Sequence, residues 1–360
     1  MYDENFEHYK NARNNGGIIY NNEKHCWELY TYETCKYVLM HDDIFSSNSK
    51  YFGGNGGLSF INMDNPEHKE YRNIIAPYFM TSKINEMRQD IKDISNELIK
   101  NLQFNSDIVK DYAVELPVRV ISNLLGIPKN DRGKFKELSD YIIGNKRDAN
   151  FAAINNYMIE KLSGLFSENP ENGIMSVIST ANVNNRNLDL NEKIGYIMLL
   201  IIGGNETTTN LITNMLKALS DNEDIINNLN TERNIHDFIE ETLRYYSPIQ
   251  FLPHRFAIDD TDINGIHINK GQRISVFLGS ANRDENVFDK PDKFILRDRN
   301  EHIAFGRGPH MCIGAPLARL EADIALNDFL ENYKKIRIDN KKSILLENPM
   351  VYGYQKMFFG

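Results

Sequence analysis

The sequence predicts a mainly α-helical protein with a smaller β region. Helical patterning runs from residue 67 to about residue 219, and it contains one exceptionally long apolar segment at 189–219. Alternating residues with turn signals follow at 255–280, which is typical of short strands. No shift in composition marks a linker, so we expect residues 1–360 to form a single domain.

Composition and charge narrow the class of protein. The 360 residues are 41% hydrophobic and 25% charged, as in ordinary globular proteins. A net charge of −9 argues against a nucleic-acid partner, which requires concentrated Lys and Arg. The purest apolar run, 197–202, is far shorter than the roughly 20 residues that a membrane helix needs, and the N-terminus lacks a signal-peptide core. We therefore expect a soluble protein with no membrane contact.

The three cysteines, Cys26, Cys35 and Cys312, predict the redox compartment. Their number is odd and no pair has C-x-x-C spacing, so no disulfide framework or zinc knuckle is indicated. A reducing cytoplasm is the simplest location for such a chain.

The first third of the chain predicts a strand, a turn and a short helix over 27–45, followed by a loop over 46–62. This loop is rich in Gly, Ser and Asn but carries apolar residues such as Phe52, Leu58 and Phe60, so it is either a binding loop or a surface turn. The helical patterning that follows predicts helices at 67–79, 83–103, 108–125, 131–143 and 151–167.

The next predicted helix, 189–219, is apolar nearly all round and is therefore buried. Asp189 and Glu192 have capping-box spacing at its start, and its length would be roughly 45 Å. Gly203-Gly204 in its middle costs about 1 kcal/mol per glycine relative to Ala, which suggests that something bulky packs there. Glu206 and Thr207 follow; they either carry a function or mark a kink solvated by the Thr hydroxyl.

The last third predicts helices at 234–246 and 315–332 and short strands at 255–280 and 335–359. Glu241 and Arg244 are spaced i,i+3 on the first of these helices. By itself such a pair is usually a weak surface ion pair.

Cys312 lies in an unusual setting, HIAFGRGPHMCIGAPLARLE at 302–321. Because glycines surround the cysteine, a large planar or metallic group could approach its sulfur closely. Backbone N–H groups could point at the thiolate, which would lower its pKa and tune a bound metal. Gly306 and Gly308 are not followed by the third glycine of a dinucleotide loop. The alternative is a buried structural cysteine.

Together these segments resemble the cytochrome P-450 family of haem-thiolate monooxygenases. Phe305-Gly306-x-Gly308-x-His310-x-Cys312-x-Gly314 matches the family's haem-binding loop at every defining position. Four other motifs match in order over nearly the whole chain: ProGluHisLysGluTyrArg at 66–72, GlyGlyAsnGluThr at 203–207, Glu241-x-x-Arg244, and AlaAsnArgAspGluAsnValPhe at 281–288. The cysteine loop is the most specific of them.

The resemblance implies the cytochrome P-450 fold, with a long central helix crossing the domain over a haem b cofactor. Cys312 would be the axial thiolate ligand of the haem iron, favouring O–O cleavage. The other residues in haem-contacting positions of the family's motifs are His68, Arg72, Gly203, Gly204, Arg255, Phe305 and His310, of which His68, Arg72, Arg255 and His310 would bind the propionates.

Two further groups of residues take roles from the same resemblance. Glu206 and Thr207 match the acid–alcohol pair that relays protons to dioxygen. Glu241 and Arg244 match a structural ion pair whose third member comes from the segment before the cysteine loop. Because that segment is about one residue shorter than usual, we expect the third member to be Arg299 rather than Arg297.

The resemblance also implies partners. The substrate would be a small hydrophobic molecule, and electrons would come from a separate ferredoxin or flavodoxin-type protein, since no fused reductase region is evident. Lys69, Arg307 and Arg319 are candidates for contacting an acidic redox partner. The predicted substrate-pocket residues are Phe52, Leu58, Phe60, Leu199, Leu200, Ile249, Phe251, Leu252 and Val351.

Three other functions remain open at this point. A peroxide-driven hydroxylase would use the same haem, although the fatty-acid-binding members of that kind lack the acid–alcohol pair present here. A non-catalytic haem sensor would need no proton relay. A structural protein without haem would lack the pigment.

Overall fold

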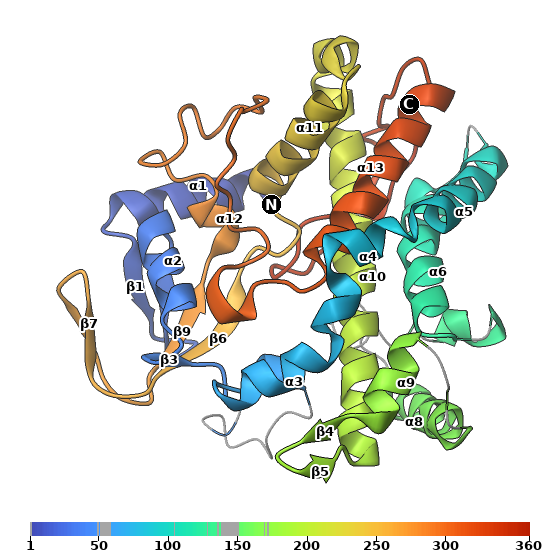
Figure 1. Ribbon diagram of the computed structural model, residues 1–360. Helices are drawn as coiled ribbons and strands as arrows, with labels where there is room; N and C mark the ends of the chain where they lie inside the picture. Colours follow the sequence, from blue (N-terminus) through green and yellow to red (C-terminus); the bar gives the residue numbers. More distant parts are fainter. Residues whose placement is uncertain are drawn as a thin grey trace. The chain divides into compact units, whose positions relative to one another are not determined.

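The computed structural model describes residues 2–48, 50, 59–103, 105–127, 129–134, 137, 151–168, 170 and 173–360. The chain divides into two compact units, each built from separate segments of the sequence. Unit 1 comprises Met1–Lys69, His236–Cys312 and Pro349–Tyr352, and unit 2 comprises Glu70–Ile235, Ile313–Asn348 and Gly353–Gly360. Helices predominate and the sheets are small, which confirms the predicted fold class (Figure 1).

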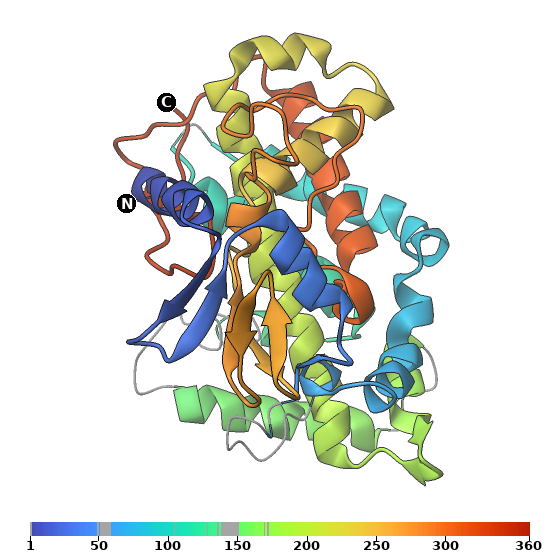
Figure 2. The ribbon, with the colours of Figure 1, turned by 90° about the vertical axis from the view of Figure 1, so that its left-hand side faces the viewer.

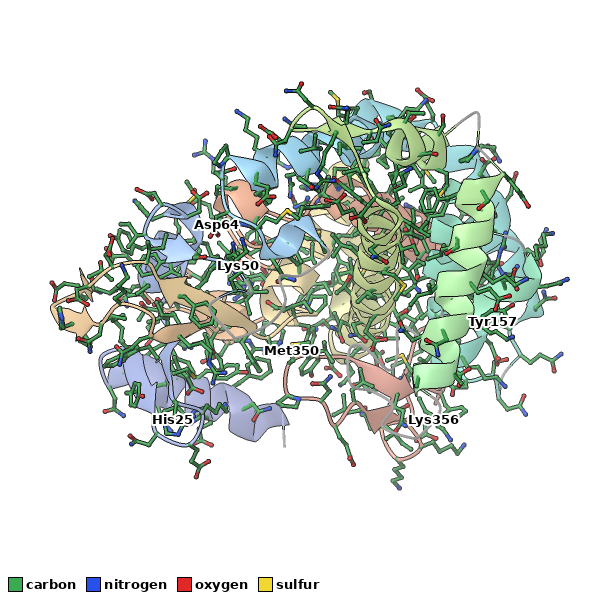
Figure 3. The ribbon with its side chains drawn as sticks, turned by 90° about the horizontal axis from the view of Figure 1, so that it is seen from below. His25, Lys50, Asp64, Tyr157, Met350 and Lys356 are labelled. Carbon is green, nitrogen blue, oxygen red and sulfur yellow. The ribbon has the colours of Figure 1, made fainter. Side chains whose placement is uncertain are left out.

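Unit 1 contains a five-stranded sheet in the order β1-β2-β9-β6-β3. The strands are β1 (Ile18–Asn21), β2 (Cys26–Leu29), β9 (Arg273–Val276), β6 (Leu252–Ala257) and β3 (Phe45–Ser46). Strands β2 and β9 pair in parallel and the other neighbours pair antiparallel. Figure 2 shows the N-terminal strands, in blue, beside the strands of residues 252–276, in orange. The turn between β1 and β2 has His25 at a positive φ of 49° (Figure 3).

Two N-terminal helices and the short helix α12 (Leu278–Ala281) complete the core of unit 1. Helix α2 (Tyr32–Met40) buries Cys35, Val38 and Leu39 in the same apolar cluster as residues from the sheet. Helix α1 (Tyr2–Asn14) contributes Tyr9 and Ala12 to a second, smaller cluster. Sequence patterning did not predict α1, because few of its residues are apolar.

Unit 2 is built around helix α10 (Leu190–Asp221), which has 32 residues and is therefore about 48 Å long. Its N-terminus has the predicted capping box, with Glu192 N donating to Asp189 Oδ1 at 2.9 Å and Asp189 N donating to Glu192 Oε2 at 2.8 Å. Helices α6 (Glu115–Leu124) and α13 (Ala315–Asn332) pack on α10, and α5 (Arg88–Asn101) packs on α6 and α13. The predicted buried central helix is thus confirmed.

The C-terminal segment of unit 2 closes this helical layer. Strand β11 (Tyr354–Lys356) pairs with β10 (Ile344–Leu345), and Ile108 N donates to Met357 O at 2.8 Å beside the π-helical turn η4 (Val109–Ala113). Gly353 lies so close to Asn210 of α10 that a Cβ atom there would overlap the Asn210 side chain. The chain's last residues therefore contact the central helix directly.

Several predicted helices are divided in the structure. The segment 67–79 becomes α3 (Glu67–Ile75) and the 3-10 turn η3 (Ala76–Phe79), and 83–103 becomes α4 (Thr81–Asn85) and α5. Most of the predicted helix 131–143 lies outside the described residues.

The remaining elements of unit 2 include two that were not predicted, α9 (Gly173–Thr180) and the hairpin of β4 (Asn182–Val183) and β5 (Arg186–Asn187). Helix α8 (Phe151–Ser167) was predicted with the same bounds. No helix in the described part of the chain is long and apolar enough to cross a membrane.

Candidate functional site

The loop before Cys312 is shaped by glycines. Gly306 and Gly308 have φ values of 71° and 70°, a region that favours glycine because other residues carry a Cβ. A Cβ on Gly308 would also overlap the carbonyl oxygen of Leu39 in α2. The loop closes through Cys312 N, which donates to Phe305 O at 2.9 Å. The backbone conformation, and not only the motif, therefore requires these glycines.

The thiol of Cys312 is exposed, whereas Cys26 and Cys35 are buried. Burial raises the pKa of the Cys35 thiol well above its usual range. Cys35 therefore stays a protonated, unreactive thiol that packs like an apolar side chain. Cys312 is the one cysteine of the three whose sulfur a ligand could reach.

A hydrogen-bond network that sequence reasoning missed supports the start of this loop in unit 1. His302 Nε2 lies 3.1 Å from Glu240 Oε2, and both side chains are buried. Ala304 N donates to His302 Nδ1 at 3.2 Å, so the proton of the neutral ring is on Nε2 and is donated to Glu240. Ile303 N donates to Asn282 Oδ1 at 2.7 Å. Asn282 lies in the matched 281–288 segment, which was the available signal.

His68 and His310 lie together in unit 1. Their ring centroids are 3.9 Å apart at an interplanar angle of 33°, and His68 is only 1% exposed. The ring of Phe60 lies 6.0 Å from that of His68. Two histidines that are 242 positions apart in the sequence are thus brought into contact, as expected if both serve one site.

Arg255 lies on β6 of the same unit. Burial lowers the pKa of its guanidinium to about 10, and the carboxylates of Asp64 and Asp42 act in the opposite direction. The lowered pKa means that these two carboxylates do not fully offset the cost of burying the positive charge. An additional anion would therefore stabilise the charged guanidinium. Arg72 is partly buried on α3 and belongs to unit 2.

The ion pair between Glu241 and Arg244 is present on α11 (Glu232–Tyr245), with two contacts of 2.8 Å and both side chains fully buried. The predicted third member, Arg299, is wrong. Arg297 fills that place, because its Nε lies 3.2 Å from Glu241 Oε2.

The path of the preceding segment explains this correction. Ile295 N and Asn300 Nδ2 both donate to the Glu241 carboxylate, at 2.9 and 3.0 Å. These bonds hold the segment against Glu241 with Arg297 turned toward the carboxylate, and Arg299 is exposed.

The middle of α10 carries the residues predicted for proton transfer. Thr207 Oγ1 donates to Gly203 O at 2.7 Å, the back-bonding that was the structural alternative for this residue. The bond uses the hydroxyl proton and leaves the oxygen able to accept one. Glu206 is 6% exposed.

No side chain of the described residues presses closely on the two glycines of α10. A Cβ on Gly204 would make ordinary contact with Ile121 at 3.7 Å, and one on Gly203 would meet no atom of the described residues within 4 Å. Gly203 therefore leaves open space beside a helix that is otherwise largely buried.

Of the predicted substrate-pocket residues, Phe52 and Leu58 lie outside the described residues. Phe60 is buried in unit 1, where Ile249 pairs with Val351 through an isolated β-bridge and Leu252 lies on β6. The ring of Phe251 stacks on Phe277 with centroids 5.0 Å apart. Leu199 and Leu200 lie on α10 in unit 2.

The sequence and the structure were both compared with those of known proteins. Residues 127–353 match the family described as Cytochrome P450. Cytochrome P450 109 of Bacillus spizizenii is 34% identical, over 98% of this chain and 90% of the relative. The solved structure of a cytochrome P450 from Picrophilus torridus with 4-phenylimidazole is 55% identical, covering 95% of this chain and 99% of that one, with a TM-score of 0.90. CYP109E1 from Bacillus megaterium in complex with testosterone is 32% identical, with 99% and 97% covered and a TM-score of 0.89.

Proposed function

Because the chain belongs to the cytochrome P450 family, and is therefore a haem b monooxygenase, we propose that Cys312 provides the thiolate that binds the haem iron. The observation that carries this proposal is the glycine loop of unit 1. It ends on an exposed thiol, and its backbone is shaped by two positive-φ glycines. A thiolate at this position would hold the iron and donate electron density to it strongly.

The residues present fit a haem. Arg255 is a partly buried cation whose lowered pKa favours an added anion, and a haem propionate is such an anion. The stacked rings of His68 and His310 can donate to the same carboxylate groups. In unit 2, Gly203 leaves space beside α10 that a side chain would fill. We propose that Arg72, Gly204 and Phe305 complete the set of haem contacts.

When bound, the haem supplies the iron at which dioxygen is activated. The proposed task of Thr207 and Glu206 is to control protons. The Thr207 hydroxyl donates its proton to Gly203 O, and this bond fixes the orientation of the hydroxyl. Its oxygen can still accept a hydrogen bond from another donor. Glu206 is a carboxyl group buried in the same helical turn and can pass a proton onward to Thr207. The neighbouring Leu200 and Ile201 are buried and apolar, so polar groups are few beside this pair on α10.

The proposed substrate is a small hydrophobic molecule. The candidate pocket residues Phe60, Leu199, Leu200, Ile249, Phe251, Leu252 and Val351 are all apolar. Apolar lining with a few polar groups is the usual character of small-molecule sites. CYP109E1, a relative of known structure, is described in complex with testosterone, an apolar molecule, which supports the same substrate class here.

We further propose that electrons come from a separate ferredoxin or flavodoxin-type protein. The five family motifs are spread over residues 66–314, and the match to Cytochrome P450 109 extends over 98% of this chain, so the P450 region itself accounts for the residues of this sequence. Lys69 is exposed and Arg307 partly so, and the charge of Arg307 acts against the raised pKa of the nearby Tyr32 hydroxyl. Arg319 on α13 is the third candidate contact.

The test of the function is spectroscopic. We expect the reduced carbon monoxide complex to show the long-wavelength Soret band of a thiolate-bound haem. Cys312→Ser should abolish that band while the matched variant Cys26→Ser keeps it. Retention of the thiolate spectrum in Cys312→Ser would assign the ligand to another residue and overturn the proposal.

A further inference from the structure

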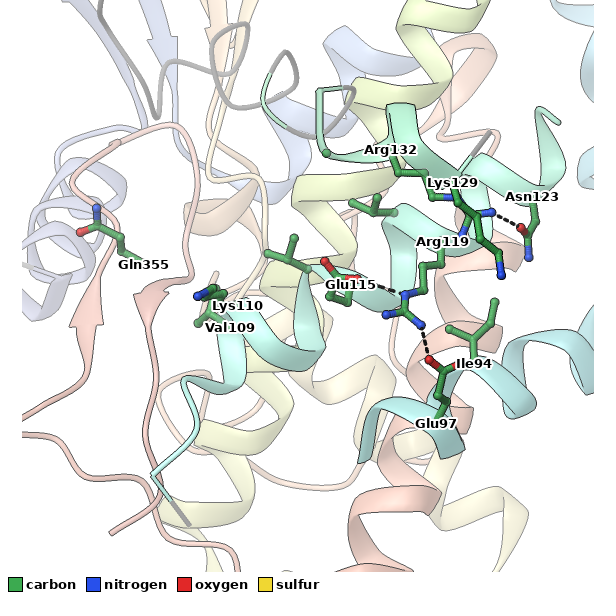
Figure 4. Close-up of a pocket in the computed structure, with 13 residues that line it drawn as sticks. Ile94, Glu97, Val109, Lys110, Glu115, Arg119, Asn123, Lys129, Arg132 and Gln355 are labelled. Carbon is green, nitrogen blue, oxygen red and sulfur yellow. Dashed lines mark hydrogen bonds and ion pairs between the residues drawn. The ribbon is translucent and has the colours of Figure 1, made fainter. Parts of the chain in front are cut away.

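A cavity lies within unit 2, formed by α5, η4, α6 and the short turn η5 (Lys129–Asp131), with Gln355 from the C-terminal segment (Figure 4). We call it the α6 pocket, and its volume is about 700 Å³. Four aliphatic residues line it: Ile94, Val109, Val114 and Val118. None of its lining residues belongs to the candidate haem, proton-transfer or substrate residues, so the site already described does not account for it.

The charges of the α6 pocket are unbalanced. Its lining contains four cations and two carboxylates: Lys110, Arg119, Lys129 and Arg132, and Glu97 and Glu115. Both carboxylates bind the same arginine. Arg119 Nε lies 3.0 Å from Glu115 and its Nη1 lies 3.0 Å from Glu97. Arg119 is therefore neutralised, and the other three cations form no ion pair with any residue that the structure describes.

Arg132 is the cation best prepared for a ligand. Its Nη2 donates to Asn123 Oδ1 at 2.7 Å, which fixes the guanidinium plane (Figure 4). Its Nε is buried and has no hydrogen-bond acceptor among the described residues, so a ligand would bind on the Nη1 side of the guanidinium. Burial lowers the pKa of Arg132, the nearby charge of Arg119 lowers it further, and Glu115 acts in the opposite direction. An incoming anion would therefore stabilise the charged form of Arg132.

The shape of the pocket narrows the class of anion. The guanidinium is a planar fork that matches the two oxygens of a carboxylate. Figure 4 shows Arg132 and Lys129 at one side of the pocket and Lys110, Val109 and Gln355 well apart from them, so space extends away from the fork. The aliphatic residues along this space would contact a hydrocarbon chain. We propose that the α6 pocket binds an amphiphilic organic carboxylate, with Arg132 binding its carboxylate.

The test is calorimetric titration of octanoate into the holoenzyme, with a haem-ligating azole added in excess so that the haem pocket is already filled. We expect binding at one site that weakens as salt is raised. Arg132→Gln should weaken it at least tenfold. Lys100→Gln, which removes an exposed cation of α5 outside the pocket, should leave it unchanged. If Arg132→Gln does not fold, Arg132→Lys keeps the charge without the fork and should weaken binding severalfold.

A second variant distinguishes ligand binding from a structural role of these residues. Glu97→Gln frees one edge of Arg119 and should tighten octanoate binding severalfold, the opposite sign to Arg132→Gln. No binding, or equal binding by wild type and Arg132→Gln, would overturn the proposal. Acetate or inorganic phosphate binding as tightly as octanoate would overturn the assignment of an amphiphile.

Discussion

At the scale of single residues, two neighbouring arginines have opposite environments. Arg297 contacts the fully buried carboxylate of Glu241, and Arg299 is exposed. We expect Arg297→Met to lower the free energy of unfolding by about 1–3 kcal/mol, because it removes a donor from a buried charge. Arg299→Met should change it by less than about 0.5 kcal/mol. Urea denaturation of both holoenzyme variants measures the difference, and equal values would contradict the assignment.

These two arginines also show where prediction from sequence stops. The pair Glu241 and Arg244 is recognisable because both residues share one helix at fixed spacing. Which residue becomes the third member depends on the path of the 294–300 segment. Hydrogen bonds from the Ile295 backbone N–H and the Asn300 side-chain amide to Glu241 fix that path. No local pattern encodes that path. The buried bond between His302 and Glu240 was missed for the same reason.

Thr207 gives a second prediction at this scale. Thr207→Ala removes the oxygen that can accept a hydrogen bond from a proton donor. It leaves the backbone of α10 and the apolar residues beside it intact. We expect the variant to bind haem and substrate normally and to consume NAD(P)H through its redox partner. The ratio of hydroxylated product to NAD(P)H consumed should fall severalfold, with hydrogen peroxide accumulating.

The matched control is Thr207→Ser, which keeps the hydroxyl and should keep most of the wild-type ratio. Product and NAD(P)H are measured in the same reaction. If Thr207→Ala left the ratio unchanged, the bond to Gly203 would be the whole role of this residue.

At the scale of elements, the start of α10 is fixed by more than its capping box. Arg186 of β5 donates to both oxygens of Glu192, each at 2.6 Å, and the Tyr71 hydroxyl of α3 donates to the same carboxylate. The hydrogen bond from Arg186 is the main reason why the pKa of Glu192 is lowered to about 2. The carboxylate therefore joins the hairpin β4–β5, α3 and α10.

A pH dependence follows from this lowered pKa. Above the pKa that glutamate has in the unfolded chain, near 4.5, the ionised Glu192 contributes its full stabilisation. This stabilisation is lost as pH falls through that value toward 2. We expect Glu192→Gln to be less stable than wild type at pH 7, and the difference between them to shrink as pH falls from about 5 to 2. Unfolding midpoints across this range measure it, and a pH-independent difference would refute the prediction.

The contacts at the start of α10 are also partly local in sequence and partly distant, and only the local ones could be predicted. The capping box at Asp189 and Glu192 was predictable, because both partners lie within one turn. Arg186 and Tyr71 were not, because they come from a hairpin that lacks a periodic pattern and from a helix 121 positions away from Glu192. Gly203 stays a prediction as a haem contact, because its role depends on a group that lies outside the protein chain.

At the scale of the whole molecule, the net charge of −9 predicts repulsion from an acidic redox partner except where cations are exposed. We expect reduction by a heterologous ferredoxin to slow as ionic strength rises from low to physiological salt, because screening shortens the reach of these charges. Lys69→Gln should slow reduction at low salt, and Lys100→Gln should not. Stopped-flow reduction under carbon monoxide measures the rate. A rate independent of salt would contradict an electrostatically guided partner.

The family and the fold class were predictable for this whole chain, because the motifs are local and occur in order. The absence of a linker predicted a single domain with an α-rich part and a smaller β-rich part, but it could not give the segments that make up each compact unit. Each unit is assembled from three separated segments, and Pro349–Tyr352 belongs to unit 1 although its flanking residues belong to unit 2. Composition changes along a chain cannot reveal an arrangement in which the chain crosses repeatedly between units.

The contact between the C-terminal segment and α10 has a consequence during protein synthesis. Asp221, the last residue of α10, is made 132 residues before Gly353, whose close approach to Asn210 completes that face of the helix. At ordinary rates of translation the interval is on the order of ten seconds. During that interval the face of α10 at Asn210 lacks Gly353 and the amide of Ile108 lacks the carbonyl of Met357, although α6 has already been made. A nonsense mutation that removed only the last eight residues would leave that face and that amide permanently without these partners.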